Sequence, residues 1–320
     1  MPIETGMTLR VAVQMDPMEG INIAGDSTFA IMRGAQQRGH RLYHYLAPHL
    51  SYSDGRVRAH VRPVEVFDQQ GDHFAYGEWQ VLDLSDDVDV VLMRQDPPFD
   101  LSYINATHLL ERVQPSTQVV NDQAAVRNAP EKLFVLDYER FMPPTMITRS
   151  LEETRAFQAH HGEIVVKPLY GNAGSAVFRI AHDGSNLSAL TELFNHVWVE
   201  PFMVQAFLPS VTEGDKRIVL IDGEVAGAIN RVPGQGEIRS NLAAGGRAEA
   251  TDLTDREREI CDALGPELAR RGLLFVGIDV IGGHLTEINV TSPTGIVAID
   301  RFNGTDTPGL IWDRIEAKLI

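Results

Sequence analysis

The 320-residue sequence is poor in cysteine and in basic residues. Its one cysteine, Cys261, excludes an intrachain disulfide and a zinc site built from several cysteines, and we assign it no catalytic role. Lys and Arg number 28 against 44 Asp and Glu, which gives a formal net charge of −16. Nonspecific binding to nucleic acid or to an anionic membrane needs a basic face. We therefore expect neither nucleic acid nor a membrane among the partners.

Long apolar runs and targeting signals are also lacking. No run reaches the ~18 apolar residues that span a bilayer, and residues 1–15 do not combine a cationic region with a long apolar core. There is no internal repeat and no low-complexity segment. We predict a cytoplasmic protein with two or three domains, each with its own core.

The first third of the chain alternates short apolar runs with helical patterns. Strands are predicted at 9–15, 88–94 and 117–120, and helices at 26–39 and 103–113. Asp26 is a candidate N-cap of the first helix, and Gly39 ends it. This alternation predicts an α/β layer with a mainly parallel sheet.

Polar turns follow two of these strands, "QMDP" at 14–17 and "RQDPPFD" at 94–100. Ligands of open α/β sheets bind beyond the carboxyl ends of the strands, so Asp16, Arg94 and Asp96 are candidate substrate-binding residues. Asp-Pro pairs are equally ordinary in turns that bind nothing.

The middle third predicts a compact α+β unit. Strands are expected at 143–149, 163–168, 175–180 and 202–208, with a helix after Ser150 and another near 186–196. Ser150 and Glu153 predict a capping box. The segment "KPLYGNAGSAVF" at 167–178 joins a lysine to a glycine-bearing turn. Such a turn either binds phosphate through backbone N–H groups and the ammonium, or is a surface hairpin.

The last third predicts two β-hairpins around a helix. The first hairpin covers 215–231 and turns at Asp222-Gly223. A glycine-rich segment, 232–247, follows; a structureless connection of this length is usually functional or disordered. Thr254 and Glu257 predict a capping box for the helix at 254–272, and residues 274–290 predict the second hairpin.

The second hairpin carries a candidate metal site. Glu287 and Asn289 are two residues apart on a strand, so their side chains leave the same face. A three-residue loop, 282–284, would place Asp279 opposite Glu287, whereas a two-residue loop would pair Asp279 with Thr286 and separate the three groups. Oxygen ligands of this kind suit Mg²⁺ held together with substrate phosphates. The polar face of a solvated hairpin would carry similar residues.

Basic side chains lie close to the glycine-rich turns, namely Lys132, Lys167, Arg217, Arg231, Arg239 and Arg247. Each alone is typical of a solvated surface. Together with a carboxylate cluster in so acidic a chain, they are what a polyphosphate site needs. No Walker A sequence is present, so a bound nucleotide would take its donors from these residues.

The order of these segments resembles the ATP-grasp carboxylate–amine ligases, and more closely the bacterial glutathione synthetases. The resemblance rests on "DPPFD" (96–100), "PEKLF" (130–134), "KPLYGNAG" (167–174), "GDKR" (214–217), "RSNLAAGGR" (239–247) and "TEINVTSPT" (286–294). It covers nearly the whole chain. Two departures are Ala173, where the family often has glycine, and Tyr170, where some members have aspartate. We expect Ala173→Gly to leave turnover unchanged or to raise it.

The resemblance implies an ATP-grasp fold with three parts: an N-terminal Rossmann-like substrate domain (1–125), a small central lid domain (126–205) and a C-terminal catalytic domain (206–320). It implies ATP-dependent ligation of γ-glutamylcysteine to glycine through an acyl phosphate, with release of ADP and phosphate. Acyl phosphates hydrolyse in water, which suits a role for 232–247 as a lid.

The resemblance also implies roles for individual residues and a set of cofactors. The nucleotide would contact Lys132, Lys167, Tyr170, Gly171, Asn172, Ala173, Gly174, Gln205, Ala206, Phe207, Leu208 and Asp215. Asp279, Glu287 and Asn289 would hold two Mg²⁺ ions, with Mn²⁺ as an alternative. Arg217, Arg231 and Arg239 would be catalytic, and Asp16, Arg94, Asp96, Asn241, Gly245, Gly246 and Arg247 would bind substrate. The family further implies a homo-oligomer that acts on small molecules.

Two other functions fit the same motifs. A sister ligase of the same fold could join a different peptide and amine, because substrate choice lies outside the nucleotide machinery. A nucleotide-binding regulator could keep the fold without turnover. The intact set of Asp279, Glu287 and Asn289 argues against the regulator.

Overall fold

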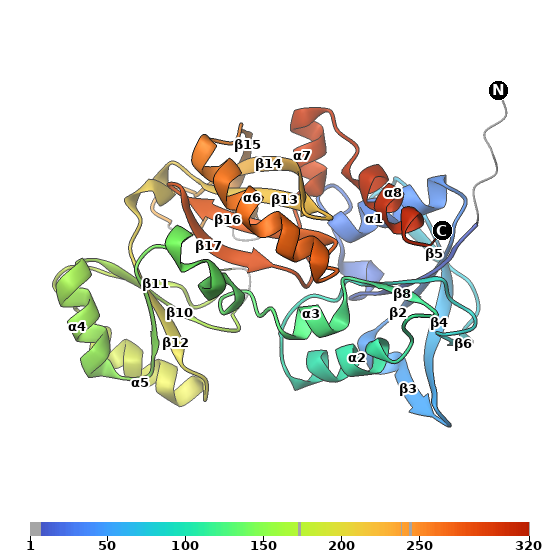
Figure 1. The fold of residues 1–320 in the computed structure, drawn as a ribbon, viewed down its shortest axis with the longest axis horizontal. Coiled ribbons are helices and arrows are strands. Elements are labelled where there is room, and N and C mark those ends of the chain that lie inside the picture. The colour runs from blue at the N-terminus through green and yellow to red at the C-terminus, as the bar shows by residue number, and fades with distance from the viewer. Residues whose placement is uncertain (1–7, 172–173, 238, 243–244, 320) are drawn as a thin grey trace.

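The computed structural model describes residues 8–171, 174–237, 239–242 and 245–319, and its strands form three sheets (Figure 1). The N-terminal sheet lies at the right of Figure 1, the central sheet at the left and the C-terminal sheet between them. Asn172 and Ala173 lie outside the described residues.

The N-terminal sheet has eight strands and is only partly parallel. β1 (Arg10–Gln14), β2 (Arg41–Tyr45), β7 (Val90–Met93) and β8 (Gln118–Val120) pair in parallel, in the order β2-β1-β7-β8. β4 (Arg56–Val66) adds antiparallel to β2 and itself pairs with β3 (Leu50–Ser53), β5 (Phe74–Tyr76) and β6 (Gln80–Asp83). The parallel strands agree with the sequence prediction, whereas the antiparallel extension was not predicted.

Helices cover both faces of this sheet. α1 (Ser27–Gln37) packs Phe29 and Met32 with Val11 and Val13 of β1, whereas Ala12 belongs to the cluster that holds α2 (Leu101–Glu111). Alternate residues of a strand point to opposite faces, so the two helices lie on opposite sides. Asp26 caps α1 as predicted, because its Oδ1 accepts from the Phe29 N–H at 2.7 Å.

The central sheet is antiparallel, in the order β11-β10-β12-β9. Its strands are β9 (Thr145–Thr148), β10 (Ile164–Pro168), β11 (Phe178–Ile180) and β12 (Phe202–Ala206), joined by α4 (Leu151–His161) and α5 (Leu187–Val197). Ser150 caps α4 as predicted, but the reciprocal half of the capping box is wrong. The Ser150 N–H donates to Thr148 Oγ1 at 2.9 Å, and the Glu153 carboxylate accepts from the Thr148 hydroxyl instead.

The C-terminal sheet is antiparallel, in the order β15-β14-β13-β16-β17. Its strands are β13 (Asp215–Ile221), β14 (Glu224–Val232), β15 (Arg247–Ala250), β16 (Phe275–Ile281) and β17 (His284–Asn289). The predicted turn at Asp222-Gly223 is confirmed, with φ of 52° and 85°. The capping box of Thr254 and Glu257 at the start of α6 (Asp255–Arg270) is also confirmed.

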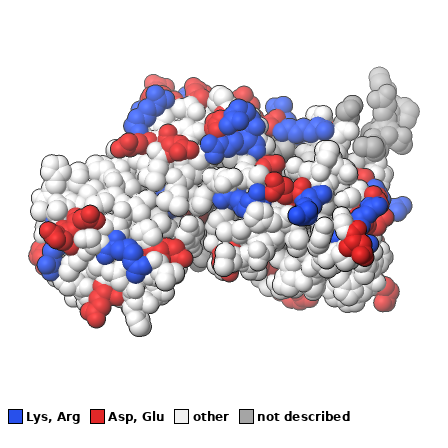
Figure 2. Space-filling model, turned by 60° about the horizontal axis from the view of Figure 1, so that its bottom comes forward, with Lys and Arg blue, Asp and Glu red and all other residues white. Residues whose placement is uncertain are grey.

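The remaining helices are short or lie near the chain end. They are α3 (Gln123–Arg127), α7 (Ile296–Asn303), α8 (Thr307–Ala317) and the 3₁₀ helices η1 (Met18–Gly20), η2 (Ala47–His49), η3 (Phe134–Phe141) and η4 (Pro209–Thr212). No helix within the described ranges has both the length and the apolar character needed to cross a membrane. On the face that Figure 2 shows, basic and acidic side chains are interspersed.

The N-terminal and C-terminal sheets share their core. Val11 and Leu92 of the first sheet belong to the same buried cluster as Val219, Ile221 and Trp312. Within the part of the chain that the structure describes, only the central sheet has a hydrophobic cluster of its own. The expectation of a separate core for each domain is therefore wrong for the two larger units. The three-part division at 125/126 and 205/206 stays a prediction.

Asn121, directly after β8, joins these two sheets. Its side-chain nitrogen donates to the carbonyls of Phe275 and Val290 at 2.8 and 2.7 Å, and its oxygen accepts from the Phe275 N–H at 2.8 Å. All of these groups are buried. The side chain thus holds β16 against the end of β8, which orients the C-terminal hairpin relative to the N-terminal turns.

Candidate active site

A cavity of about 350 Å³ lies where the three sheets meet. Asp96 and Pro97 line it from the N-terminal sheet, Lys167 and Gln205 from the central sheet, and Asp279 from the C-terminal sheet. Most of the residues singled out in the sequence reach it. They are Asp96, Lys132, Lys167, Gly171, Gly174, Gln205, Ala206, Phe207, Leu208, Asp215, Arg217, Arg231, Arg239, Asn241, Asp279, Glu287 and Asn289.

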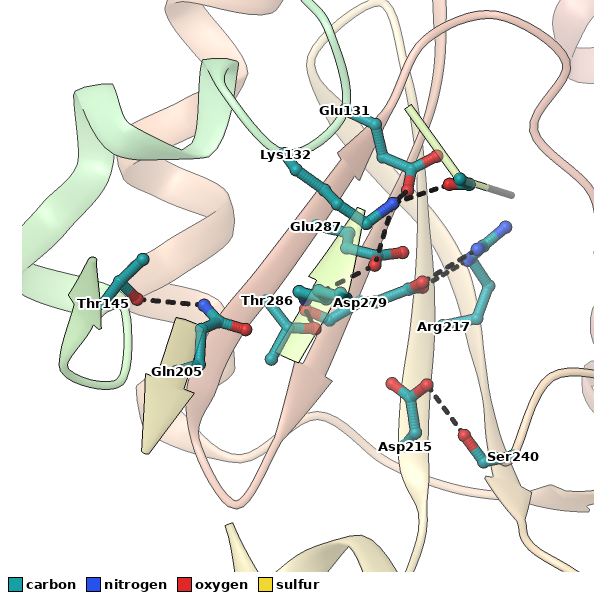
Figure 3. A network of polar contacts seen from close by, with 12 residues as sticks. Glu131, Lys132, Thr145, Gln205, Asp215, Arg217, Ser240, Asp279, Thr286 and Glu287 are labelled. Atoms are coloured by element: carbon teal, nitrogen blue, oxygen red, sulfur yellow. Dashed lines mark hydrogen bonds and ion pairs between the residues drawn. The ribbon is translucent and has the colours of Figure 1, made fainter. Parts of the chain in front are cut away.

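One part of the wall is largely apolar. It is formed by the end of β12 and the chain that follows, with Val165, Ala206, Phe207, Leu208, Val211 and Ile281. Gln205 is the polar exception, and its side-chain nitrogen donates to Thr145 Oγ1 at 3.0 Å (Figure 3). Apolar walls with a few placed polar groups are typical of sites for flat heterocycles.

The opposite part of the wall is charged and densely paired (Figure 3). Lys132 Nζ contacts the Glu131 carboxylate and donates to the Gly171 carbonyl at 2.8 Å. Glu287 Oε1 lies 3.5 Å from the ammonium of Lys132 and 3.5 Å from that of Lys167. The two lysines therefore extend from different elements toward one carboxylate.

Burial and these neighbours shift the pKa values in opposite directions. Burial, and then the nearby Glu287 carboxylate, raise the pKa of Glu131 to about 7 against the effect of Lys132. Burial lowers the pKa of Lys167, although Glu287 opposes this. Burial also acts to raise the pKa of Glu287, but Lys132 and Lys167 outweigh it and lower that pKa. Glu287 is thus anionic between two cations.

The hairpin of β16 and β17 reaches the predicted pairing by an unpredicted route. Its loop has two residues, Gly282 and Gly283, with φ of 54° and 77°, which is the shorter of the two loop lengths that the sequence left open. A two-residue loop alone would pair Asp279 with Thr286. A β-bulge restores the expected partner: Val280 pairs with Leu285, Asp279 pairs with Glu287, and Thr286 is the extra residue.

A chain of polar contacts runs from Asp279 to the glycine-rich segment. Arg217 binds both carboxylate oxygens of Asp279, at 2.6 and 3.0 Å. Arg231 lies 3.0 Å from Asp279 and donates to Asp215 at 2.5 Å. The Ser240 hydroxyl donates to the same Asp215 oxygen at 2.9 Å (Figure 3). Asp215 thereby anchors the segment 239–242 beside the cavity.

The pKa values of the two carboxyl groups in this chain of contacts shift in opposite directions. Burial acts to raise the pKa of Asp279, but Arg217 and Arg231 outweigh it and hold that pKa well below its usual range. Burial raises the pKa of Asp215 to about 6, although Arg231 acts against this. Asp215 Oδ1 is buried without a hydrogen-bond partner among the described residues, so the cavity offers an acceptor to a ligand hydroxyl.

The donor set at the base of the hairpin fits Mg²⁺. Asp279, Glu287 and Asn289 all line the cavity. Within the described residues, no three His, Cys, Asp or Glu side chains gather as a metal site. The protein therefore supplies two carboxylates and one amide. Mg²⁺, which keeps water and phosphate oxygens among its ligands, suits so sparse a set.

The glycine-bearing turn that holds Gly174 lies close to Asn241 of the segment 239–242. Gly174 has a φ of 71°, and a Cβ at this position would lie 3.0 Å from Asn241 Oδ1. Tyr170 points away from the main cavity and stacks on Phe99, with ring centroids 6.1 Å apart and an interplanar angle of 13°. Tyr170 therefore contacts the "DPPFD" turn.

Several predicted substrate residues do not line the cavity. Arg94 is buried and donates to Thr28 Oγ1 at 3.0 Å and to the Pro293 carbonyl at 2.8 Å. Asp16 accepts from the Asp96 N–H at 2.7 Å and so holds the neighbouring turn. The Arg247 side chain is 76% exposed and pairs with Glu249. Gly245 and Gly246 shape the backbone of the loop.

Sequence reasoning missed Glu131, Ser240 and Ser292. Glu131 lines the cavity, Ser240 holds Asp215, and Ser292 donates to Asp96 Oδ1 at 2.8 Å. Each lies inside a motif that the sequence had already marked, beside a charged or turn-forming neighbour. The partners of the two serines lie 25 or more residues away in the sequence, and no local pattern reveals such contacts.

Comparison with known proteins agrees with this geometry. The family model "Prokaryotic glutathione synthetase, N-terminal domain" matches residues 9–127, and "Prokaryotic glutathione synthetase, ATP-grasp domain" matches residues 131–304. The glutathione synthetase of Rhodopseudomonas palustris is 57% identical over 312 residues, which span 98% of this chain and 99% of that protein. That of Agrobacterium fabrum is 55% identical over 308 residues, or 96% of each chain.

Solved structures show the same fold at low sequence identity. D-cycloserine synthetase DcsG has a TM-score of 0.69 at 16% identity, covering 97% of this chain and all of its own. The ATP-grasp ligase PsnB, complexed with its minimal precursor, has a TM-score of 0.65 at 20% identity, covering 98% and 100%. Fold and cavity thus define an ATP-grasp ligase. On its sequence relatives and family models, the chain belongs to the prokaryotic glutathione synthetase family.

Proposed function

We propose that this protein joins γ-glutamylcysteine to glycine at the expense of ATP and so forms glutathione. Membership of the glutathione synthetase family supports this reaction. The observation that carries it is one cavity in which an apolar wall, two lysines and the Asp279, Glu287 and Asn289 set converge. A regulator that only bound ATP would need no such combination, and the family assignment disfavours a sister ligase.

The reaction proceeds in two steps. The γ-phosphoryl group of ATP passes to the cysteinyl carboxylate of γ-glutamylcysteine, which gives ADP and an acyl phosphate. The amine of glycine, having lost a proton from its ammonium form, attacks the acyl carbon. The C–N bond forms as the C–O bond to phosphate breaks, and phosphate leaves. No covalent bond to the enzyme is required.

The nucleotide lies along the cavity in this proposal. Adenine occupies the apolar wall from Gln205 to Leu208, and the Asp215 Oδ1 accepts from a ribose hydroxyl. The phosphates approach Lys132 and Lys167 and the loop of Tyr170, Gly171 and Gly174; the predicted nucleotide contacts Asn172 and Ala173 lie outside the described residues. The lysines lower the energy of the transferring phosphoryl group because they neutralise its charge.

Asp279, Glu287 and Asn289 would hold Mg²⁺, which supplies Lewis-acid stabilisation of phosphate oxygens when bound. Two ions, or Mn²⁺ in their place, belong to the same proposal. Asp279 keeps its charge beside two arginines, so it remains an anionic oxygen donor at neutral pH. Arg217, which also donates to the Thr294 carbonyl at 3.2 Å, holds that carboxylate in place.

The arginines and the N-terminal turns complete the site. Arg231 and Arg239 face the cavity and would stabilise negative charge on the reacting carboxylate and acyl phosphate. The peptide would enter from Asp96, whose turn is held by Asp16 and lies next to Arg94. Asn241, with the loop of Gly245, Gly246 and Arg247, would cover it and exclude water.

An omission assay tests the function. MgATP, γ-glutamylcysteine and glycine are supplied together and then omitted one at a time while ADP and glutathione are measured. We expect release of both only with the complete mixture. Release with another acceptor alone would indicate a sister ligase, and tight ATP binding without release would indicate a regulator. Asp279→Asn should lower turnover at least ~100-fold, and the exposed Asp183→Asn should not.

The wider setting of the protein belongs to the same proposal. It acts on small molecules in the cytoplasm as a homo-oligomer, with a lid domain between a substrate domain and a catalytic domain. Size-exclusion chromatography with light scattering tests the oligomer. A single monomer mass at micromolar concentration would contradict it.

A further inference from the structure

Glu131 is the one carboxylate on the charged wall to which the sequence motifs assign no role. Its main chain is fixed to the metal-site strand, because its carbonyl accepts from the Ile288 N–H at 3.3 Å. Its side chain lines the cavity and contacts the ammonium of Lys132 (Figure 3). Glu131 thus meets Lys132 at the point where the nucleotide phosphates are proposed to bind.

The ammonium of Lys132 has three N–H donors and three oxygens around it. It contacts Glu131, donates to the Gly171 carbonyl at 2.8 Å, and lies 3.5 Å from Glu287 Oε1. Its side chain is only 4% exposed, so water offers it little compensation. If the contact with any one of these oxygens is lost, the ammonium is therefore expected to move toward the other two.

Charge balance shows which way it would move. Glu131, Lys132, Glu287 and Lys167 form a network of two carboxyl groups and two ammonium groups. Without the Glu131 charge, Glu287 is the remaining anion for both ammonium groups. The Lys132 ammonium would move closer to Glu287 and bind a carboxylate oxygen that the proposed metal site needs. It would also lose its hydrogen bond to the Gly171 carbonyl.

We propose that Glu131 is a positioning residue that holds Lys132 at the phosphate loop and so keeps Glu287 available for Mg²⁺. This inference rests on the proposed function, because it assumes that nucleotide phosphates bind at Lys132. It predicts an unusual direction for the change in nucleotide affinity when the Glu131 charge is lost. A carboxylate near a phosphate site normally repels the phosphate, so loss of its charge alone would tighten nucleotide binding. Loss of a positioning residue weakens it.

Calorimetry with ADP, in the absence of metal, separates these cases. We expect Glu131→Gln to weaken ADP binding by about 10-fold, which is the size of one lost charge-assisted hydrogen bond. The exposed Glu139→Gln is the matched control and should bind as the wild type does. Equal or tighter binding by Glu131→Gln would overturn the proposal. Thermal unfolding of each variant shows that it is folded.

A double-mutant cycle tests whether Glu131 acts through Lys132. In a Lys132→Ala background, Glu131→Gln should weaken ADP binding no further. Additive losses would overturn the proposal. In steady-state assays, Glu131→Gln should raise KM for MgATP and the half-saturating Mg²⁺ concentration more than it lowers kcat, and Glu131→Asp should restore part of both. A wild type that binds ADP but makes no glutathione would refute the proposed function while leaving the ADP test of Glu131 intact.

Discussion

Asp279 and Glu287 lie directly opposite each other on β16 and β17, although the turn between the strands is one residue too short for that pairing. The extra residue is Thr286, whose hydroxyl donates to the Asp279 carbonyl at 3.1 Å. A bulge bends its strand and turns adjacent side chains toward one face. The arrangement of Asp279 and Glu287, the proposed metal ligands, therefore depends on Thr286 as well.

The first prediction concerns this bulge. Thr286→Val keeps the shape of the side chain but removes the donor to the Asp279 carbonyl, so it should lower the free energy of unfolding by about 1 kcal/mol. It should also raise the half-saturating Mg²⁺ concentration. Denaturant unfolding and a Mg²⁺ titration of ADP release measure the two effects. Thr286→Ser keeps the hydroxyl and should resemble the wild type; a Val variant with unchanged values would refute the role.

Lys167 should contribute mainly to turnover. Its ammonium is buried beside Glu287, where a phosphate would meet it without competition from water. Lys167→Ala should lower the single-turnover rate of ADP release at least ~100-fold, the scale for one major electrostatic stabiliser. Lys318→Ala, on the surface beside Asp222, provides the control. Near-normal release by the first variant would remove Lys167 from the site.

Gly246 permits a close backbone approach within the loop over the cavity. A Cβ at this position would lie 1.8 Å from the Ser240 carbonyl oxygen, so Gly246→Ala must displace the residue that anchors to Asp215. We expect ADP release to outrun glutathione formation, because water reaches the acyl phosphate. Gly234→Ala meets no atom within 4 Å and should keep the two rates equal. Equal rates of ADP release and glutathione formation in both variants would contradict this expectation.

Asn121 should matter for stability rather than for chemistry. Asn121→Ala leaves three buried backbone groups of β16 and Val290 without their partner. Each such loss costs about 1 kcal/mol or more, so we expect a loss of about 3 kcal/mol in unfolding free energy. Urea denaturation of this variant and of the exposed Asn128→Ala compares them. A difference below about 1 kcal/mol would mean that water replaces the amide.

His44 should make stability depend on pH. Burial lowers the pKa of His44, whose ring nitrogens contact the Tyr76 hydroxyl at 2.8 Å and the Asp16 carbonyl at 3.2 Å. As pH falls below about 6.5, the unfolded chain binds a proton that the folded protein resists, so stability decreases. The difference in unfolding free energy between the wild type and His44→Gln should therefore be smaller at pH 5 than at pH 8.

A pH-independent gap between the wild type and His44→Gln would show that the imidazole titrates alike in both states. Melting temperatures at half-unit steps of pH give the comparison. Other histidines are common to both proteins, so their contributions cancel in the difference.

Local signals predicted most elements near the site. Asp26 and Thr254 are caps whose acceptor lies three residues from its donor, and Asp222-Gly223 supplies the positive φ of a tight turn. The pair Gly282-Gly283 carried the same signal, but the sequence left open whether His284 also belonged to the loop. The bulge that compensated for it has no comparable signature, because it depends on how β17 packs.

Contacts between distant residues account for what sequence reasoning missed. The antiparallel strands β3 to β6 pair through β4, and the cores of the two larger units merge through side chains far apart in the chain. The charge of Arg94 suggested a contact with substrate. In the structure its guanidinium donates instead to the carbonyl of Pro293, which lies 199 residues away in the sequence. Nothing near Arg94 distinguishes these two uses.

The order of residues along the chain was sufficient for the class of fold and for the chemical groups of the site, because caps, turns, periodicity and motifs are local. Which carboxylate faces which cation was settled by packing. Glu131, Lys132 and Glu287 come from two segments that meet only when the sheets assemble, and in a buried site the nearest opposite charge dominates. Folding therefore decides that Lys132 donates to the Gly171 carbonyl and that Asp279 is held by two arginines.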